Sequence, residues 1–438
     1  MIRQIIIMKN PIIFIFSSIP LLLISGPFLS GIAVIIIGLY GLYNLKLYNQ
    51  IKEKINIKFI IIIFLLFYLY LLSISSVSIF PKESFKSSLF YFRFILFSLG
   101  AFFLIKEYKN IIYRLLFIFL SSSFIIIFLS LITELFLNYL FFQDDNTGQL
   151  TGIFFKEKIA GSYISRLYPL LIGLAIIYKK KIFNISKNNL ILIIFLISVS
   201  SVLLSGERTS IAIFIFSNII LVIGLKVYRN LIFSKISMIS LVSIFIFISI
   251  FANSVFERVL IKTANQLTEG NEINIFTSHH ESHIVTAFKM FKHNKITGVG
   301  PRMFRHLCDK KNYLDIYNSE IQYSNNGKPK FLNGKLLIKH YNGCSTHPHN
   351  MLFQILSETG LIGLAFYLLF IFLIYKDLLK ILNRSIQNES FIISLTALAC
   401  LCSSFFPLIP SNNFFGSYIN IYYYFMLSFY LISKNEIS

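Results

Sequence analysis

The sequence predicts an all-α polytopic membrane protein with about twelve transmembrane helices and one large, partly helical loop on the outer side of the membrane. Hydrophobic residues make up 56% of the 438 residues and charged residues only 13%, about half of what soluble proteins carry. Apolar runs of about 20 residues, each long enough to span the hydrocarbon core as a helix, recur along the chain. One long polar stretch, residues 252–348, interrupts them.

The apolar runs are separated by short polar links or by glycine and proline. Gly26-Pro27 alone separates the first two runs, so the second could be a hairpin partner or a re-entrant segment. No convincing small-residue cleavage site follows the first run, which is therefore expected to be a retained helix. The predicted spans are 10–26, 28–44, 58–77, 86–105, 111–137, 159–178, 189–205, 209–225, 231–251, 349–375, 390–409 and 416–433.

Lysine and arginine are unevenly distributed between the links, which predicts the orientation of the chain, because positively charged loops remain in the cytoplasm. Links on the side of the N-terminus are rich in these residues, for example 226–235 and 376–384, whereas the opposite links hold few. Both termini are therefore expected in the cytoplasm and residues 252–348 outside. The net charge of +21 then reflects topology and contact with anionic membrane lipid, and no nucleic-acid partner is expected.

The outer loop is too long to be a mere connector. It contains two helix-like stretches, FANSVFERVLIKTANQ and SHHESHIVTAFKMFKH. All eight histidines of the chain lie between His279 and His349, seven of them in this loop and His349 directly after it. For His293 and His340 we prefer the plain explanation that polar residues are allowed in such a loop.

Motifs for metals and nucleotides are missing from the sequence. His280-Glu281 is followed by His283, which is not the H-E-x-x-H spacing of zinc proteases. His279 and His283 are four residues apart, so a lone metal site remains an alternative to a role in packing or on a helix surface. No D-x-D pair and no P-loop glycine pattern occurs. We therefore expect no metal and no cofactor.

The four cysteines fall into two pairs. Cys308 and Cys344 share the outer loop, where a disulfide is possible. Cys400 and Cys402 lie inside an apolar span and are expected to be small core residues.

The segment SGERTS, residues 205–210, joins two apolar spans by a very short link. It places Arg208 at the outer end of both spans with Glu207 beside it, which suggests a fixed geometry. A guanidinium group at that depth can bind phosphate oxygens in bidentate fashion. The alternative is an arginine that only extends to the interface.

Two further basic residues flank the start of another span. Lys158 lies at the outer membrane edge and Arg166 about two turns inside the span, where an ionisable residue is a functional candidate by default. The alternative for Arg166 is an ion pair with Glu134 or Glu358.

Arg302 and Arg305 follow the glycine- and proline-containing turn GVGP in the outer loop. They are three residues apart, so both can face the same way if the segment is helical. The alternative is a solvated basic face.

The segment CSTHPHN brings His347, His349 and Asn350 to the start of an apolar span. After Pro348, His349 and Asn350 would occupy the first turn of a helix, whose free N–H groups and dipole favour anions. A neutral imidazole can take up a proton near neutral pH. Together these residues predict a site where an anionic lipid headgroup binds while a hydroxyl is deprotonated. The alternative, a helix cap and an interfacial histidine, accounts for Asn350 alone.

His349-Asn350, nine residues, Gly360, two residues and Gly363 resembles the signature of the O-antigen ligases, whose domain is shared by some O-antigen polymerases. SGERTS and ITGVGPRMF look like the opening and the mid-loop turn of that domain. The resemblance is strongest over about 195–375. It suggests an N-terminal transmembrane bundle (1–188), an O-antigen ligase-like domain that includes the loop (189–375) and C-terminal transmembrane helices (376–438).

The resemblance implies a metal-independent membrane glycosyltransferase of the GT-C type that acts in lipopolysaccharide biosynthesis. The donor would be a glycan on undecaprenyl diphosphate at the periplasmic face of the bacterial inner membrane, and the acceptor lipid A–core. His349 would be the general base or would contact the acceptor or the diphosphate, and Arg208 would bind the diphosphate. No clean motif marks the arginine expected in the loop, for which Arg302, Arg305 and Arg258 are candidates.

Two other functions remain open at this point. A polymerase would use the same donor and extend a lipid-linked glycan, because a fold does not determine the acceptor. A transporter or flippase of lipid-linked sugars would usually show paired repeats and broken helices, neither of which is clear in the sequence.

Overall fold

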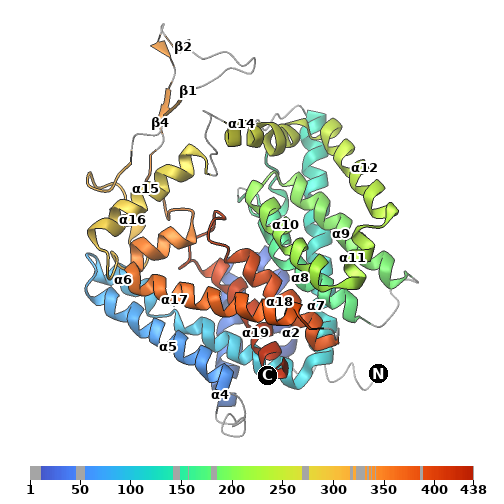
Figure 1. The fold of residues 1–438 in the computed structure, drawn as a ribbon, viewed down its shortest axis with the longest axis horizontal. Coiled ribbons are helices and arrows are strands. Elements are labelled where there is room, and N and C mark those ends of the chain that lie inside the picture. Colours follow the sequence, from blue (N-terminus) through green and yellow to red (C-terminus); the bar gives the residue numbers. More distant parts are fainter. Residues whose placement is uncertain are drawn as a thin grey trace.

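The structure of the protein is a computed structural model. It describes residues 11–45, 55–141, 148–155, 157–178, 185–268, 276–315, 319–321, 331–332, 335–336, 338–340, 342–384 and 388–437. Helices dominate the structure, as predicted (Figure 1). The helices and helical turns are α2 (Pro11–Ser17), α3 (Ile19–Ile24), α4 (Pro27–Leu45), α5 (Ile55–Ser76), α6 (Pro81–Ser88), α7 (Phe92–Phe141), η2 (Gly152–Phe154), α8 (Ala160–Ile177), α9 (Lys187–Leu204), α10 (Arg208–Gly224), α11 (Lys226–Ile232), α12 (Lys235–Phe251), α13 (Asn253–Phe256), η3 (Glu257–Ile261), α14 (Lys262–Thr268), α15 (Ser278–His293), α16 (Phe304–Leu307), α17 (Met351–Leu382), α18 (Glu389–Ser404) and α19 (Ser417–Ile437).

Each predicted apolar run coincides with helical structure, but the division into spans differs. The runs 86–105 and 111–137 both lie in α7, which is kinked where Tyr108 leaves helical geometry. Within the described residues, six helices are long and apolar enough to cross a membrane, or seven if the bent pair α11–α12 is one span. The helices are those of a membrane protein, whereas twelve crossings remain a prediction.

Helix α8 lies at the centre of the helical bundle. Helices α7, α9, α10 and α18 pack against it, and 89% of its residues are buried, more than in any other candidate span. One apolar cluster joins residues from α2 to α19, so the helices before and after the outer loop form one packed body.

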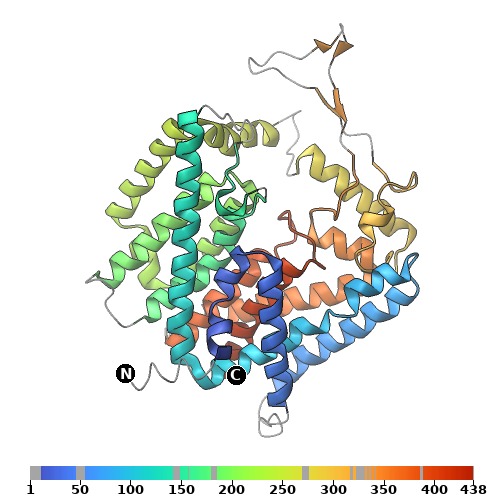
Figure 2. The same ribbon diagram turned by 180° about the vertical axis from the view of Figure 1, so that it is seen from behind.

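The region between α12 and α17 has a small core of its own. Its two helix-like stretches form α13–α14 and α15, as predicted. The apolar side of α15 packs against the segment 299–308, through Ala287, Met290, Val299, Met303, Phe304, Leu307 and Cys308. Cys308 is bonded to Cys344, whereas Cys400 and Cys402 are free and buried, as expected for core residues. Figure 2 shows α15 and α16 side by side, next to α6 and α17.

Four short strands lie in the same region and project away from the helices (Figure 1). Strand β1 (Ser319–Ile321) pairs antiparallel with β4 (Ile338–His340). Strand β2 (Phe331–Leu332) pairs antiparallel with β3 (Lys335–Leu336). His340 is therefore a strand residue, away from the helices that build the site described next.

Candidate active site

The segment between Asn350 and Gly360 folds as one short helix, which ends at a break at Gly360. Asn350 caps this helix: its Oδ1 accepts a hydrogen bond from the Phe353 backbone N–H (3.2 Å), and its Nδ2 donates to the Pro407 carbonyl oxygen (2.9 Å). Nine residues later Gly360 has φ 64° and ψ −162°, a conformation that is essentially restricted to glycine. The nine-residue spacing is thus the length of the helical piece before the break in α17.

The turn GVGP packs into this break. The Gly300 N–H donates to the Glu358 carbonyl oxygen (2.9 Å), and the Leu361 N–H donates to the Lys295 carbonyl oxygen (2.9 Å). A Cβ on Gly298 would overlap the peptide between Glu358 and Thr359, and a Cβ on Gly360 would overlap the Ile296 carbonyl group. Two glycine-containing segments that lie far apart in the sequence therefore satisfy each other's backbone groups.

The carboxylate of Glu358 fixes the residues that follow the turn. Glu358 is 1% exposed, and it accepts hydrogen bonds from the Phe304 N–H (2.9 Å) and from Gln354 Nε2 (3.0 Å). Arg305 is held nearby, with Nη2 3.3 Å from the Thr346 carbonyl oxygen. The Nε atoms of Arg302 and Arg305 are buried and have no hydrogen-bond partner within the described residues. Both arginines can therefore offer donors to a ligand.

Glu207 in SGERTS fixes the backbone that carries Arg208. It is 6% exposed, and it accepts hydrogen bonds from the Gly161 N–H at the start of α8 (2.8 Å) and from Ser210 Oγ (2.7 Å). Gly206 forms the turn, with φ 62°. The carboxylate thus joins the N-termini of α8 and α10 and directs Arg208 away from the bundle.

The Arg208 side chain contacts the start of the outer-loop region. Its Nη1 donates to Gln266 Oε1 (2.5 Å), and its Nη2 and Nε donate to the Arg258 carbonyl oxygen (3.3 and 3.4 Å). Arg258 Nε in turn donates to the Gly206 carbonyl oxygen (3.1 Å). Arg208 and Arg258 therefore lie side by side, in a geometry that a side chain extending freely to the interface would not have.

Arg166 and Lys158 lie at the N-terminal side of α8. Arg166 is buried and donates from Nη1 to Ser162 one turn earlier, and Lys158 is exposed just before the helix. The predicted alternative partners of Arg166 are engaged elsewhere: Glu134 accepts from the Gly152 N–H, and Glu358 binds Phe304. The roles of both basic residues in substrate binding stay predictions.

Three histidines of α15 join the two histidines that precede α17. The ring of His349 lies 4.1 Å from that of His347, 5.2 Å from that of His283 and 5.7 Å from that of His280, measured between centroids. The rings of His279 and His283 are 4.5 Å apart. We call these five residues the histidine cluster. The sequence analysis did not assign the three α15 histidines to the site, although their crowding in one loop was a signal for it.

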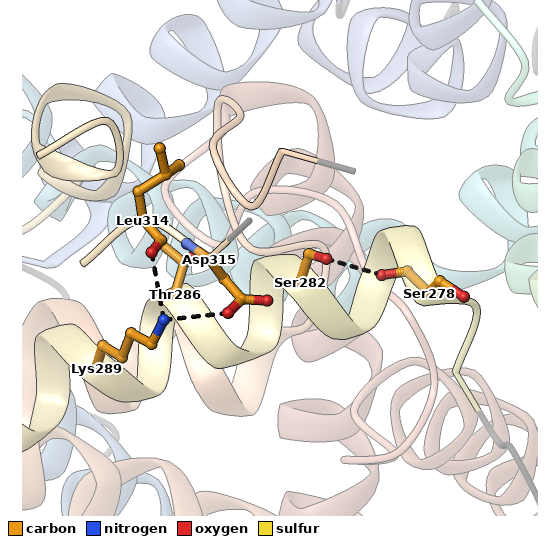
Figure 3. Close-up of polar contacts among 6 residues, drawn as sticks. All are labelled: Ser278, Ser282, Thr286, Lys289, Leu314 and Asp315. Atoms are coloured by element: carbon orange, nitrogen blue, oxygen red, sulfur yellow. Dashed lines mark hydrogen bonds and ion pairs between the residues drawn. The ribbon is translucent and has the colours of Figure 1, made fainter. Parts of the chain in front are cut away.

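Side chains of α15 anchor the helix to the segment that holds Leu314 and Asp315 (Figure 3). Lys289 Nζ binds the carboxylate of Asp315 (3.1 Å) and the Leu314 carbonyl oxygen (3.2 Å). Thr286 Oγ1 accepts a hydrogen bond from the Asp315 N–H (3.2 Å). The bond between Cys308 and Cys344 ties the same region to the segment that carries His347 and His349.

Four histidines of the cluster, His280, His283, His347 and His349, have pKa values below the usual range, so they are uncharged at neutral pH. Burial, followed by the neighbouring imidazoles, lowers the pKa of His349 to about 3. Burial also lowers the pKa values of His347 and His280 to about 4. The positive charge of Arg305 adds to the shift in the pKa of His347, and that of Arg208 to the shift in the pKa of His280. The site is therefore less basic than the sequence suggested, and it is a place where a negative charge would be stabilised.

Three helices begin at or next to residues of the candidate site. Arg208 is the first residue of α10, His280 lies in the first turn of α15, and His349 precedes the cap of α17. Helix N-termini present free N–H groups and the positive end of the helix dipole. Together with Arg208, Arg305 and the five imidazoles of the histidine cluster, these helix N-termini form a site for an anionic group of the size of a phosphate or diphosphate.

A metal-binding arrangement is not found at the cluster. In the described part of the chain, no group of three histidine, cysteine, aspartate or glutamate side chains is placed to hold a metal ion. His279 and His283 are neighbours on α15, as the alternative of a lone metal site required, but they lack a third ligand of this kind there.

Acid should destabilise this region, because its histidines are neutral in the fold and become protonated when the chain unfolds. An unfolded histidine titrates near pH 6.5, whereas the folded pKa is about 3 for His349 and about 4 for His280 and His347. Below pH 6.5 the unfolded chain therefore binds more protons, and stability falls as the pH drops towards 4. The Tm of the purified protein should be lower at pH 5 than at pH 7.5.

A double variant, His280→Gln and His347→Gln, is the control for this prediction. It should show a smaller loss of Tm between pH 7.5 and pH 5 than the unchanged protein. An equal loss in both proteins would assign the acid sensitivity to groups outside the cluster.

Comparison with known proteins gives one family match. Residues 193–368 match the family model described as O-antigen ligase. The matched range begins in α9, ends in α17, and includes Arg208, α15, the GVGP turn, His349 and Gly360. No curated protein matches the chain.

Proposed function

Because residues 193–368 match the family model described as O-antigen ligase, we propose that the protein is an O-antigen ligase that transfers a glycan from undecaprenyl diphosphate to lipid A–core. The observation that carries this proposal is the meeting of Arg208, the histidine cluster and three helix N-termini at one site. Such a site suits a diphosphate whose lipid lies in the membrane and whose glycan extends from it. The family itself indicates a membrane glycosyltransferase-like enzyme with lipid-linked glycan substrates.

In the proposed reaction His349 accepts the proton of an acceptor hydroxyl. The hydroxyl oxygen forms a bond to the anomeric carbon of the donor glycan, and the bond from that carbon to the diphosphate oxygen breaks. The diphosphate leaves with the electron pair. The negative charge of the diphosphate beside His349 favours the protonated imidazole. It therefore raises the pKa of His349 from the value of about 3 that burial and the neighbouring imidazoles produce.

Arg208 acts on the leaving group in this proposal. Its guanidinium group neutralises the charge that develops on the diphosphate as the glycosidic bond breaks. The contacts of Arg208 to Gln266 and the Arg258 carbonyl oxygen hold the group in position, which favours reaction over mere binding. No step of this reaction requires a metal ion or a nucleotide.

The remaining candidate residues bind or position substrates. His347 and Asn350 flank His349, and Arg305 is linked to Thr346 in the same segment. We propose that Arg302 and Arg305 contact the glycan or the diphosphate from the outer side. Arg166 and Lys158 are proposed to bind anionic substrate groups from the side of α8.

The topology belongs to the same proposal. Twelve crossings, with both termini in the cytoplasm, would place residues 252–348 and the histidine cluster at the periplasmic face of the bacterial inner membrane. The division into 1–188, 189–375 and 376–438 then separates two sets of helices from the part that carries the active site. The lysine and arginine distribution supports this orientation.

Polymerase activity is the second candidate. The family match spans the donor-side residues that both reactions need, and it leaves the acceptor open. The broken helix α17 also resembles a transporter feature, but its break carries the glycine motif of the ligases and packs against the GVGP turn. This packing favours a glycan transferase over a transporter.

A transfer assay with the purified protein tests the proposal. The protein receives undecaprenyl-diphosphate glycan and lipid A–core, with and without EDTA. Glycan on lipid A–core, formed equally in EDTA, is the expected result. Elongated lipid-linked glycan with unmodified lipid A–core would make the protein a polymerase. Inhibition by EDTA that a divalent cation reverses would contradict metal independence.

Arg208→Lys is expected to lower kcat by about a hundredfold, the scale seen when one charge-stabilising donor is removed. Lysine keeps the positive charge but lacks the planar group that binds two phosphate oxygens at once. Arg229→Lys, at an exposed position on α11, is the matched control and should behave as the unchanged protein. Full activity of Arg208→Lys would show that the positive charge alone suffices.

A further inference from the structure

We propose that His280 is a third residue that binds the donor diphosphate, as a neutral N–H donor held in one tautomer by Thr277. The inference rests on the proposed function and adds a residue that the ligase-like motifs of the sequence do not contain. His280 is a catalytic residue in this proposal, because it touches the leaving group. Thr277 is a positioning residue that acts through it.

Thr277 makes two contacts with His280. As the cap of α15, its Oγ1 accepts a hydrogen bond from the His280 backbone N–H (3.3 Å). The same oxygen lies 2.7 Å from His280 Nδ1. The hydroxyl group can donate its own hydrogen to Nδ1 while its oxygen accepts from the backbone. We assign Nδ1 as the acceptor, which places the ring hydrogen on Nε2.

The ring of His280 neighbours that of His349, and the charge of Arg208 acts on it. Its centroid is 5.7 Å from that of His349, and Arg208 is close enough for its charge to lower the pKa of His280. His279, the next residue along the chain, is exposed on the helix surface. His280 therefore combines a ring close to that of His349 with the electrostatic effect of Arg208.

A neutral N–H donor suits this position. The pKa of His280 is about 4, so the imidazole donates a hydrogen bond at pH 7 without taking up a proton first. A protonated His280 would be a third positive charge near Arg208 and Arg258, and the two arginines would repel it. During the reaction the hydrogen stays on Nε2, and the bond to the phosphate oxygen strengthens as the diphosphate gains charge.

The test measures binding of undecaprenyl diphosphate, with undecaprenyl monophosphate for comparison, to the purified full-length protein. His280→Leu should weaken binding of the diphosphate by about tenfold or more, the effect of losing a hydrogen bond to a charged group. His280→Gln should retain most of the affinity, because its amide nitrogen reaches the place of Nε2 and donates. His293→Gln, in the last turn of α15 with its ring against Tyr313, is the control and should bind normally.

Thr277 variants test the tautomer separately from the helix cap. Thr277→Ser keeps the hydroxyl group and should bind the diphosphate normally. Thr277→Gly is a tolerated cap that costs only a few tenths of a kcal/mol, but it lacks the hydroxyl group and should weaken binding and lower kcat. Equal behaviour of the serine and glycine variants would overturn the role of Thr277.

Two results would overturn the role of His280 itself. One is unchanged binding by His280→Leu, and the other is a glutamine variant as weak as the leucine variant, which would mean that the ring acts by packing or as a base. If the unchanged protein fails to bind undecaprenyl diphosphate, the proposed function falls together with this inference. If the unchanged protein binds and transfers while His280→Leu does so equally well, only the inference falls.

Discussion

His349→Ala is expected to lower kcat for glycan transfer by about 10²–10⁴-fold, the contribution of a positioned general base, while the protein remains folded in the membrane. The imidazole is the group proposed to accept the acceptor proton, and its ring has those of His347, His283 and His280 around it. Each of these neighbouring rings projects from a different backbone position, so none of them occupies the place of the lost imidazole. The transfer assay with purified protein measures the loss directly.

The backbone at His349 dictates the control for this variant. His349 has φ 53°, a left-handed conformation that alanine tolerates poorly and asparagine tolerates well. His349→Asn therefore keeps the local fold and removes the base, and it should lose as much activity as His349→Ala. Near-normal transfer by His349→Asn would reject His349 as the base and leave the left-handed backbone as the reason for the alanine defect.

The sequence points to one part of the candidate site and gives little sign of the other. His349, Asn350 and Arg208 were predicted because helix starts next to apolar spans are local patterns. The contact between α15 and the segment before α17 joins residues about 70 positions apart, as from His280 to His349. No periodicity within either segment reports such a contact. The crowding of histidines in one loop was the only trace of it.

Span boundaries were less predictable for a different reason. Hydropathy identifies apolar stretches, but it does not register where a long helix kinks, as α7 does at Tyr108, or where two short helices replace one span, as α2 and α3 do. The basicity of His349 was also misjudged, because a pKa near neutrality assumes exposure to water. In the structure, burial and neighbouring imidazoles bring that pKa to about 3.

Gly360→Ala is expected to impair the enzyme almost as strongly as loss of His349, although Gly360 contacts no substrate in the proposed reaction. With φ 64° and ψ −162°, the residue occupies a region that costs other residues of order 1–3 kcal/mol. A Cβ would in addition overlap the Ile296 carbonyl group. The chain would relieve the backbone strain and the overlap by straightening α17. This movement would pull the GVGP turn away from Glu358.

The consequence reaches the active site through the turn. Without its docking on the broken helix, the hydrogen bonds from Gly300 to the Glu358 carbonyl oxygen and from Phe304 to the Glu358 carboxylate would be lost. Arg305 would then move away from His347, on which its charge acts, and Arg302 would move with the same turn. Transfer activity and Tm should both fall in Gly360→Ala. Gly31→Ala, on α4 with open space at the Cβ position, should leave activity unchanged, because alanine favours a helix. If Gly360→Ala behaved like Gly31→Ala, the break in α17 could not be what holds the loop arginines at the site.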